Sequence, residues 1–166
     1  AGAAMLGADF CAPMLSHTHR KQRSGPNRPE FVAADAMNLP FAADRFDFAT
    51  IAFGIRNVAD PAVALREMAR VVRPGGRVVV LEFCKPRLPV FRQLYGFYFG
   101  QILPRLGKWI CGSEGDAYRY LHDSVQAFPE REEFLALMRE AGLEQPRQRL
   151  LSGGIAAIYR AEVRKG

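Results

Sequence analysis

The residues best suited to chemistry stand at the ends of two short apolar runs. Residues 31–34 lead into Asp35, and residues 46–53 lead to Arg56 and Asn57. Apolar runs of this length, bounded by turn residues, are typical of strands buried on both faces of a parallel α/β sheet. In open sheets of that kind the ligand binds beyond the carboxyl ends of the strands. We therefore expect the chemistry at Asp35 and at the Arg56-Asn57 pair.

Another strand is expected earlier in the chain, over residues 3–9, and it ends at Asp9. An acidic residue at the end of the second strand of a nucleotide-binding α/β fold accepts hydrogen bonds from ribose hydroxyls. An aspartate at a strand end also serves as the cap of a following helix. From the residues alone the cap is the better interpretation of Asp9, and the ligand contact stays open.

The remaining elements follow from periodicity and turn residues. Helices are expected over residues 12–22, from Asp60-Pro61 to the Pro74-Gly75-Gly76 turn, and over residues 130–141. A central strand is expected over residues 77–83, with Glu82 as its single charge. Glu82 either faces the site or pairs with a neighbouring arginine, because an unpaired buried carboxylate is costly. Residues 144–151 and 155–163 predict a hairpin joined at Ser152-Gly153-Gly154.

Several motifs carry a family resemblance. They are Asp-Ala-x-x-Leu-Pro-Phe from Asp35, Phe-Gly-Ile-Arg-Asn-Val over residues 53–58, and Arg-Pro-Gly-Gly-Arg-Val-Val-Val-Leu-Glu-Phe over residues 73–83. With these motifs the chain resembles the S-adenosylmethionine-dependent C-methyltransferases of ubiquinone and menaquinone biosynthesis, from about Gly7 to about Arg160. Arg73 and Cys84 stand where that family usually has Lys and Ser.

The resemblance implies a class I S-adenosylmethionine-dependent methyltransferase, an α/β Rossmann-like sheet that ends in an antiparallel hairpin. In that family a first strand and a Gly-rich loop precede the strand that ends at Asp9, and no such loop appears here. We therefore expect residues 1–166 to form a single methyltransferase domain without its first βα unit. The absent strand would lie between the strands 3–9 and 46–53.

The resemblance also implies a cofactor site for S-adenosylmethionine. Asp9 matches the residue that binds the ribose, and Asp35 and Ala36 match the adenine-edge position. Met37 either lies against the purine or belongs to the core. Ala52 stands near the cofactor and offers only backbone atoms and a methyl group.

For the substrate, the resemblance implies a polyprenylated hydroquinone, either a demethylmenaquinol or a polyprenyl methoxybenzoquinol, that is methylated on a ring carbon. Arg56 and Asn57 match the pair beside the substrate oxygen. A guanidinium stays protonated, so Arg56 would stabilise a forming phenolate; the alternative is a structural salt bridge. Tyr118 and Tyr120 are expected to line the ring pocket. The helical stripe Phe91, Leu94, Tyr95, Tyr98, Ile102 either packs in a core or covers a lipid-like substrate.

The composition limits the setting. The 166 residues are 49% hydrophobic and 24% charged, with a net charge of +6. Three scattered cysteines predict reduced thiols in a cytoplasmic protein, and the histidines form no metal-ligand pattern. We expect no metal and no nucleic acid, but peripheral contact with the inner face of a membrane, because the chain is basic and its substrate is lipid-like. The sequence leaves the oligomeric state open, a homodimer included.

Three other functions remain to be separated from this one. A methyltransferase for another small molecule or for RNA would share Asp9 and Asp35 but would not need Gly-Ile-Arg-Asn. A nicotinamide-dependent oxidoreductase also uses an acidic strand end, but the Leu-Pro-Phe and Arg-Pro-Gly-Gly motifs count against it. A non-catalytic partner would have lost cofactor binding together with the glycine loop.

Overall fold

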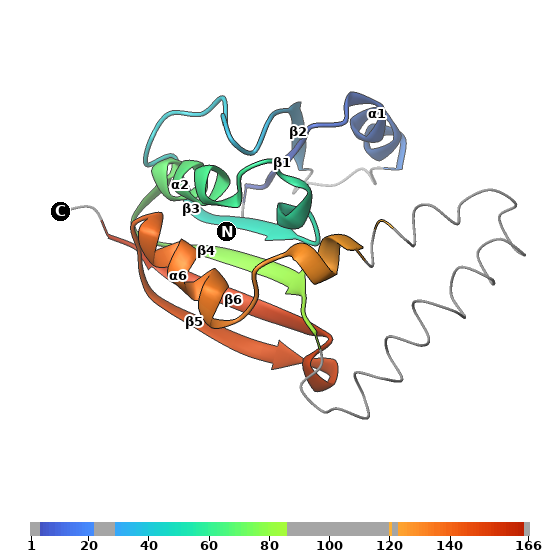
Figure 1. The fold of residues 1–166 in the computed structure, drawn as a ribbon. Helices are drawn as coiled ribbons and strands as arrows, with labels where there is room; N and C mark the ends of the chain where they lie inside the picture. The colour runs from blue at the N-terminus through green and yellow to red at the C-terminus, as the bar shows by residue number, and fades with distance from the viewer. Residues whose placement is uncertain (1–3, 22–28, 86–119, 121–122, 165–166) are drawn as a thin grey trace, which may run out of the picture.

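The computed structural model describes residues 4–21, 29–85, 120 and 123–164, and the side chains of 17–21 are not among the described atoms. Its elements are both strands and helices, as Figure 1 shows. In order they are β1 (Leu6–Asp9), α1 (Ala12–Lys21), β2 (Glu30–Ala33), β3 (Phe46–Ala52), η1 (Ile55–Asn57), α2 (Pro61–Val71), β4 (Val72–Phe83), α6 (Glu132–Glu140), β5 (Leu143–Leu151), η3 (Ser152–Gly154) and β6 (Ala156–Val163).

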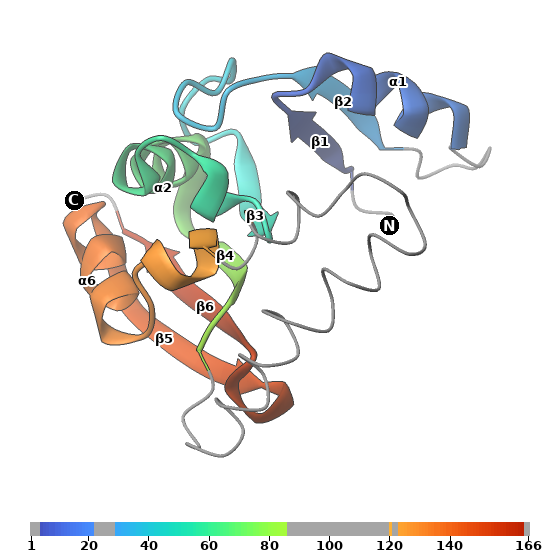
Figure 2. The ribbon, with the colours of Figure 1, turned by 45° about the vertical axis from the view of Figure 1, so that its right-hand side comes forward.

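The strands form two sheets. β1 and β2 pair in parallel, with Asp9 opposite Ala33, and α1 packs against them (Figure 2). The second sheet has the order β3-β4-β6-β5. Within the described residues β1 and β3 do not pair with each other, and the expectation of a further strand between them stays a prediction. β4 lies between β3 and β6, so the prediction of a central strand there is confirmed.

The larger sheet changes direction halfway across. β3 and β4 run parallel, whereas β6 runs antiparallel to both β4 and β5. The predicted hairpin is thus present as β5 and β6, joined by η3, where Gly153 and Gly154 have φ of 68° and 93°. Glycine adopts this left-handed backbone without the steric cost of a side chain.

One face of this sheet carries the core. α2 and α6 both cover it, as Figure 1 shows, and the buried residues of both helices share one cluster with β4, β5 and β6. The start of α2 is the predicted one: Oδ1 of Asp60 accepts hydrogen bonds from the N–H groups of Ala62 and Val63, and Pro61 occupies the first turn. A proline fits there because its missing N–H would have had no helical partner. The α2 side chains buried in this core are Ala64, Leu65, Met68, Ala69 and Val71.

The predicted end of α2 is wrong. The helix stops at Val71, and Val72 already pairs with Phe46, so β4 begins before the Pro-Gly-Gly turn rather than after it. Phe48 then pairs with Arg77, and residues 73–76 form an irregular corner between these two pairs. Gly76 is required in this corner, because a Cβ on it would lie 2.6 Å from the carbonyl oxygen of Asp47. Turn residues therefore mark a corner within the strand, a structure that periodicity cannot distinguish from a helix end.

The aromatic stripe Phe91, Leu94, Tyr95, Tyr98, Ile102 and the residue Tyr118 lie outside the described residues. Both interpretations of the stripe therefore stay predictions.

Candidate active site

Arg56 and Asn57 lie in η1, at the carboxyl end of β3. Ile55 is fully buried in the core and anchors this turn. Hydrogen bonds from Asn57 N to Gly54 O and from Val58 N to Ile55 O close it, at 3.0 and 3.2 Å. Because the buried Ile55 anchors the turn in the core, Arg56 and Asn57 stay at the carboxyl end of β3, where the sequence predicted the chemistry.

The guanidinium of Arg56 forms a buried ion pair with Glu82, near the end of β4. Nη1 donates to Oε1 at 2.9 Å, and the two side chains are only 10% and 1% exposed. The sequence left open whether Glu82 faces the site or pairs with an arginine, and the structure shows that it pairs with the site arginine itself. The salt bridge considered as the structural alternative for Arg56 is therefore present, and it belongs to the candidate site.

Three further contacts hold the Arg56 side chain. Nη1 also donates to the carbonyl oxygen of Phe53 at 2.5 Å, and Nε lies 3.4 Å from Oγ of Ser124, in a helical turn over residues 123–127. The guanidinium carbon lies 5.4 Å from the ring centre of Phe83, within the range of a cation–π contact. Within the described residues Nη2 donates no hydrogen bond, so it is the donor left for a ligand.

Asn57 is joined to one of the predicted substrate residues. The hydroxyl of Tyr120 donates to Oδ1 of Asn57 at 3.1 Å. Tyr120 is 58% exposed, so its ring is available to a ligand on this edge. The structure thus brings Arg56, Asn57, Glu82 and Tyr120 into one cluster.

Asp9 stands at the carboxyl end of β1 with an exposed side chain. Its Oδ1 accepts from the N–H of Cys11 at 2.8 Å, just before α1 begins. The cap-like contact predicted from the residues is therefore present. It uses one carboxylate oxygen, and within the described residues Oδ2 accepts no hydrogen bond, so Asp9 keeps an acceptor for a ligand hydroxyl.

Asp35 follows β2 and organises a tight turn. Its Oδ1 accepts from Met37 N at 2.8 Å, and its carbonyl oxygen accepts from Asn38 N at 3.0 Å. Asp35, Ala36 and Met37 are half-buried, and none of the three is a member of the main core cluster. Core packing in that cluster therefore does not explain Met37, and its side chain remains available to a planar ligand.

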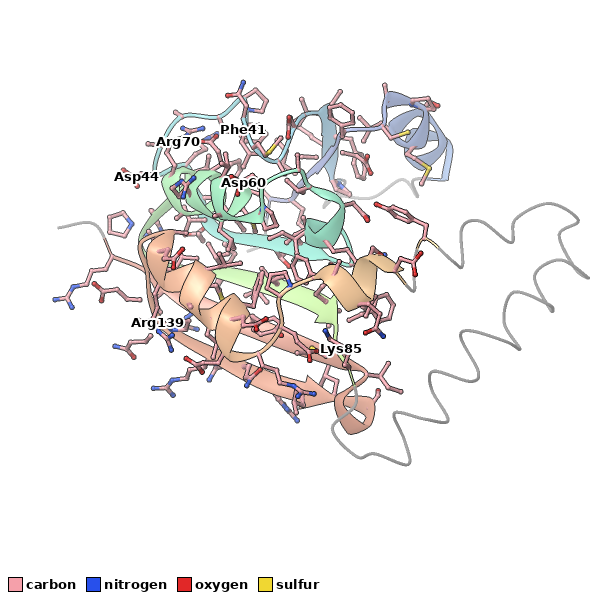
Figure 3. The ribbon with its side chains drawn as sticks, in the orientation of Figure 1. Phe41, Asp44, Asp60, Arg70, Lys85 and Arg139 are labelled. Carbon is pink, nitrogen blue, oxygen red and sulfur yellow. The ribbon has the colours of Figure 1, made fainter. Side chains whose placement is uncertain are left out.

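An ion pair that the sequence analysis did not identify holds the chain after this turn. Glu67 accepts from Arg70 Nε at 2.7 Å and from the N–H of Leu39 at 2.9 Å. Arg70 in turn donates to the carbonyl oxygens of Leu39 and Phe41, and Figure 3 shows it beside Phe41. The Arg70 guanidinium holds the pKa of Glu67 below its usual range, against the opposing effect of partial burial. The i, i+3 spacing of Glu67 and Arg70 on the predicted helix was a usable signal.

Ala52 is the last residue of β3 and is exposed, so it can offer a ligand only its methyl group and backbone. Asp9 and Asp35 form a second group, at the carboxyl ends of β1 and β2. Within the described residues no hydrogen bond or ion pair joins this group to the Arg56 cluster.

Neither a metal site nor a membrane span emerges from the part of the chain that the structure describes. There, no group of three or more His, Cys, Asp and Glu side chains is arranged to hold a metal ion. No described helix is long and apolar enough to cross a membrane.

Comparison with known proteins points to one family. Residues 1–162 match the model of the ubiE/COQ5 methyltransferase family. The chain is 48% identical over 162 residues to a ubiquinone/menaquinone biosynthesis C-methyltransferase UbiE of Bdellovibrio bacteriovorus, covering 97% of the chain and 68% of the relative. It is 49% identical over 158 residues to a demethylmenaquinone methyltransferase of Thermus thermophilus, covering 95% and 71%. A demethylmenaquinone methyltransferase of Clavibacter sepedonicus is 43% identical, and the chain spans 64% of its length.

Solved structures agree on the fold. A SAM-dependent methyltransferase of Thermotoga maritima superposes with a TM-score of 0.65 at 18% identity, over 96% of this chain and 73% of that one. A SAM-dependent methyltransferase of Methanosarcina mazei gives 0.63 at 18%, over 99% and 84%. These likenesses confirm the predicted fold class, the α/β Rossmann-like fold of class I methyltransferases.

Proposed function

We propose, from the premise that the chain belongs to the ubiE/COQ5 methyltransferase family, that its protein transfers a methyl group from S-adenosylmethionine to a ring carbon of a polyprenylated hydroquinone. The product would serve menaquinone or ubiquinone biosynthesis, as the names of its relatives indicate. One observation carries the proposal. Arg56, in the loop predicted to meet the substrate, is held almost buried with one donor nitrogen unused, beside an exposed Asn57–Tyr120 pair.

The residues at the ends of β1 and β2 fit the adenosine part of the cofactor. The second oxygen of Asp9 can accept from a ribose hydroxyl, and the second oxygen of Asp35 can accept from an adenine amino group. Each aspartate already anchors its first oxygen on a backbone N–H, so its orientation is set before a ligand binds. The half-buried Met37 side chain can lie against the purine. When bound, S-adenosylmethionine supplies a methyl group on a sulfonium centre that needs no covalent catalysis.

The Arg56 cluster can stabilise the negative charge that forms on the oxygen of the acceptor ring. A hydroquinone carbon becomes more nucleophilic as its hydroxyl proton leaves, and the resulting phenolate carries negative charge. The Arg56 guanidinium can donate a charge-assisted hydrogen bond through Nη2 to that oxygen. Asn57 and Tyr120, joined by their hydrogen bond, can contact the ring or its second oxygen. Tyr118 stays a prediction for the same pocket.

The proposed substrate sets the proposed location. A polyprenyl chain partitions into lipid, so the protein must take its substrate from a membrane surface. We place the protein on the cytoplasmic side, in peripheral contact with the membrane. A homodimer is compatible with this arrangement but is not required by it.

The experiment uses Arg56→Ala and Arg56→Lys in the full natural protein, assayed for methyl transfer to a short-chain hydroquinone. We expect Arg56→Ala to lower kcat roughly 100–1,000-fold, the effect of removing one donor to a developing oxyanion. Lysine cannot reproduce the planar fork, so Arg56→Lys should recover only part of the rate. The affinity for S-adenosylmethionine should not change in either variant.

Arg73→Ala is the matched control, because Arg73 pairs with Asp47 on the exposed surface and lies at the opposite end of β4. It removes the same charge and should keep the wild-type rate. Wild-type turnover in Arg56→Ala would remove Arg56 from the mechanism. Equal losses of kcat in Arg56→Ala and Arg73→Ala would show that Arg56 contributes only to the net charge of the protein.

A further inference from the structure

We propose that Glu82 is a positioning residue for Arg56, whose buried carboxylate fixes the direction in which the guanidinium offers its free donor to the substrate oxygen. This inference rests on the proposed function of Arg56 and extends it to a residue that does not touch the substrate.

Glu82 lies where an apolar residue is expected. It shares the covered face of β4 with Val78 and Val80, both fully buried, and stands opposite Ala157 on β6. With 1% of its side chain exposed, the carboxylate has lost nearly all contact with water. Burying a charge in such surroundings is costly unless it is paired.

The pairing of Glu82 is incomplete. Oε1 accepts from Arg56 Nη1 and from the N–H of Phe83, both at 2.9 Å. Oε2 is buried and, within the described residues, has no hydrogen-bond partner. A buried polar atom without a partner in a native structure calls for an explanation, and a functional site is a common one.

The Glu67–Arg70 pair shows what a structural pair looks like in the same chain. There both carboxylate oxygens are used: Oε1 accepts from Arg70, and Oε2 accepts from Arg70 and from Leu39 N. That pair ties a loop to a helix. The Glu82–Arg56 pair uses one oxygen to hold one guanidinium, and apolar residues of similar size would often stabilise a fold equally well.

The geometry shows how the direction is fixed. Nη1 of Arg56 carries two hydrogens, and the carbonyl of Phe53 and Oε1 of Glu82 each accept one. The Phe83 ring lies against the guanidinium and packs on Phe53, with ring centres 4.4 Å apart and the two planes tilted by 34°. Because two acceptors hold Nη1 and a ring lies against the guanidinium face, these contacts restrict the direction in which Nη2 points. Without Glu82 the guanidinium could turn about its last torsions.

The test combines Glu82→Gln, Glu82→Leu, Arg56→Ala and the double variant Arg56→Ala/Glu82→Leu in the full natural protein. The glutamine oxygen can still accept from Nη1, so Glu82→Gln should lose about tenfold in kcat, and Glu82→Leu should lose more. KM for the hydroquinone and affinity for S-adenosylmethionine should stay near wild type. The double variant should be no slower than Arg56→Ala alone, because Glu82 acts only through Arg56.

Glu162→Gln is the control, since it neutralises a carboxylate paired with an arginine on the exposed sheet face. It should leave kcat unchanged. If Glu82→Leu fails to fold, the double variant still provides the comparison, because it removes both members of the buried pair. The proposal would be overturned if the fold-loss of kcat in the double variant were the product of the losses in Arg56→Ala and Glu82→Leu. Full activity in Glu82→Gln would overturn it too.

A second readout does not depend on activity. In the wild-type protein the ¹⁵N signals of the Arg56 guanidinium should show slow rotation about the Nε–Cζ bond, and in Glu82→Gln faster rotation. Equally slow rotation in the wild type and in Glu82→Gln would contradict the positioning role of Glu82. If the NMR result holds while no hydroquinone is methylated, the proposed function fails and the positioning of Arg56 by Glu82 stands.

Discussion

The carboxylate of Asp9 has two oxygens with different surroundings. One accepts from Cys11 N at the start of α1, and the other accepts no hydrogen bond within the described residues. The helix-cap and ligand-contact interpretations are therefore compatible, because each uses a different oxygen. A cap contact made by Oδ1 also limits the rotation of the carboxylate, so that Oδ2 is directed before a ribose arrives.

Asp9→Ala in the full natural protein should weaken S-adenosylmethionine binding by roughly 1–3 kcal/mol, because ribose hydroxyls lose a charged acceptor. Asp9→Asn separates the two roles, since its amide oxygen can still accept from Cys11 N. It should keep the thermal stability of the wild type and lose part of the affinity. Asp47→Ala, which removes an exposed carboxylate at the start of β3, is the control for isothermal titration. An unchanged dissociation constant in Asp9→Ala would remove Asp9 from the site.

At the scale of residues, the sequence identified the polar residues that follow the strands but not the side chains that contact them. Arg56 was predicted from its place after an apolar run and from the family motif. Its pairing with Glu82 could only be left as an alternative, because 26 positions separate the two residues and no local rule relates them. Ser124 and Phe83, which complete the surroundings of Arg56, carry no pattern that would connect them to it.

At the scale of elements, local chemistry predicted the start of α2 better than its end. Asp60-Pro61 marks the beginning of α2 because the capping oxygen and the missing proline N–H act within one turn of helix. The end of α2 depends on the pairing of Val72 with Phe46, a contact between distant segments. Such tertiary contacts override local signals, and for this reason the boundary between α2 and β4 was misplaced.

A buried cluster ties the end of β4 to the segment before α6. The hydroxyl of Tyr159 accepts from Arg131 N at 2.9 Å and lies 3.4 Å from the sulfur of Cys84. Lys85 N donates to Glu130, and Figure 3 shows Lys85 at the end of β4. Burial raises the pKa of both the Tyr159 hydroxyl and the Cys84 thiol, so both stay neutral at working pH. The cluster therefore acts by hydrogen bonding and packing rather than by charge.

Tyr159→Phe should lower the free energy of unfolding by about 1–3 kcal/mol, because it leaves the N–H of Arg131 without its acceptor. The ring itself is kept, so its contact with Phe134, at 4.6 Å between centres, should survive. Denaturant unfolding of the full natural protein measures the change. Tyr120→Phe is the comparison, since that hydroxyl is on an exposed side chain and should contribute little to stability. Equal stabilities of wild type and Tyr159→Phe would show that Arg131 N finds another partner.

For the whole molecule, charge is distributed unevenly over the faces of the larger sheet. Arg147 and Arg160 stand directly opposite each other on β5 and β6, and Arg160 lies on the face of β6 that α2 and α6 do not cover. Together with Arg77 they line a shallow hollow, and only Arg77 has an ion-pair partner, Glu162, among the described residues. Like charges directly opposite on paired strands repel, so an anionic surface nearby would stabilise the arrangement. The composition alone predicted a basic chain but not which surface carries the arginines left unpaired within the described residues.

The full natural protein should float with vesicles that contain anionic lipid at low salt, and less so as salt rises. Arg147→Glu/Arg160→Glu should abolish most of this binding. Arg66→Glu/Arg164→Glu makes the same change in net charge elsewhere, on α2 and after β6, and should weaken it much less. Equal weakening by both double variants would mean that net charge alone is responsible. Binding that does not respond to salt would point instead to an apolar anchor.

The most direct test of the central claim is methyl transfer by the full natural wild-type protein, with isotope-labelled S-adenosylmethionine and a panel of acceptors. The panel contains a short-prenyl naphthohydroquinone, a short-prenyl benzohydroquinone, a catechol, a primary amine and a transfer RNA, and mass spectrometry locates the label. The account predicts label on a ring carbon of one or both hydroquinones, and none on oxygen, nitrogen or RNA. Label on oxygen or nitrogen, or turnover of the other acceptors with none of the hydroquinones, would contradict it.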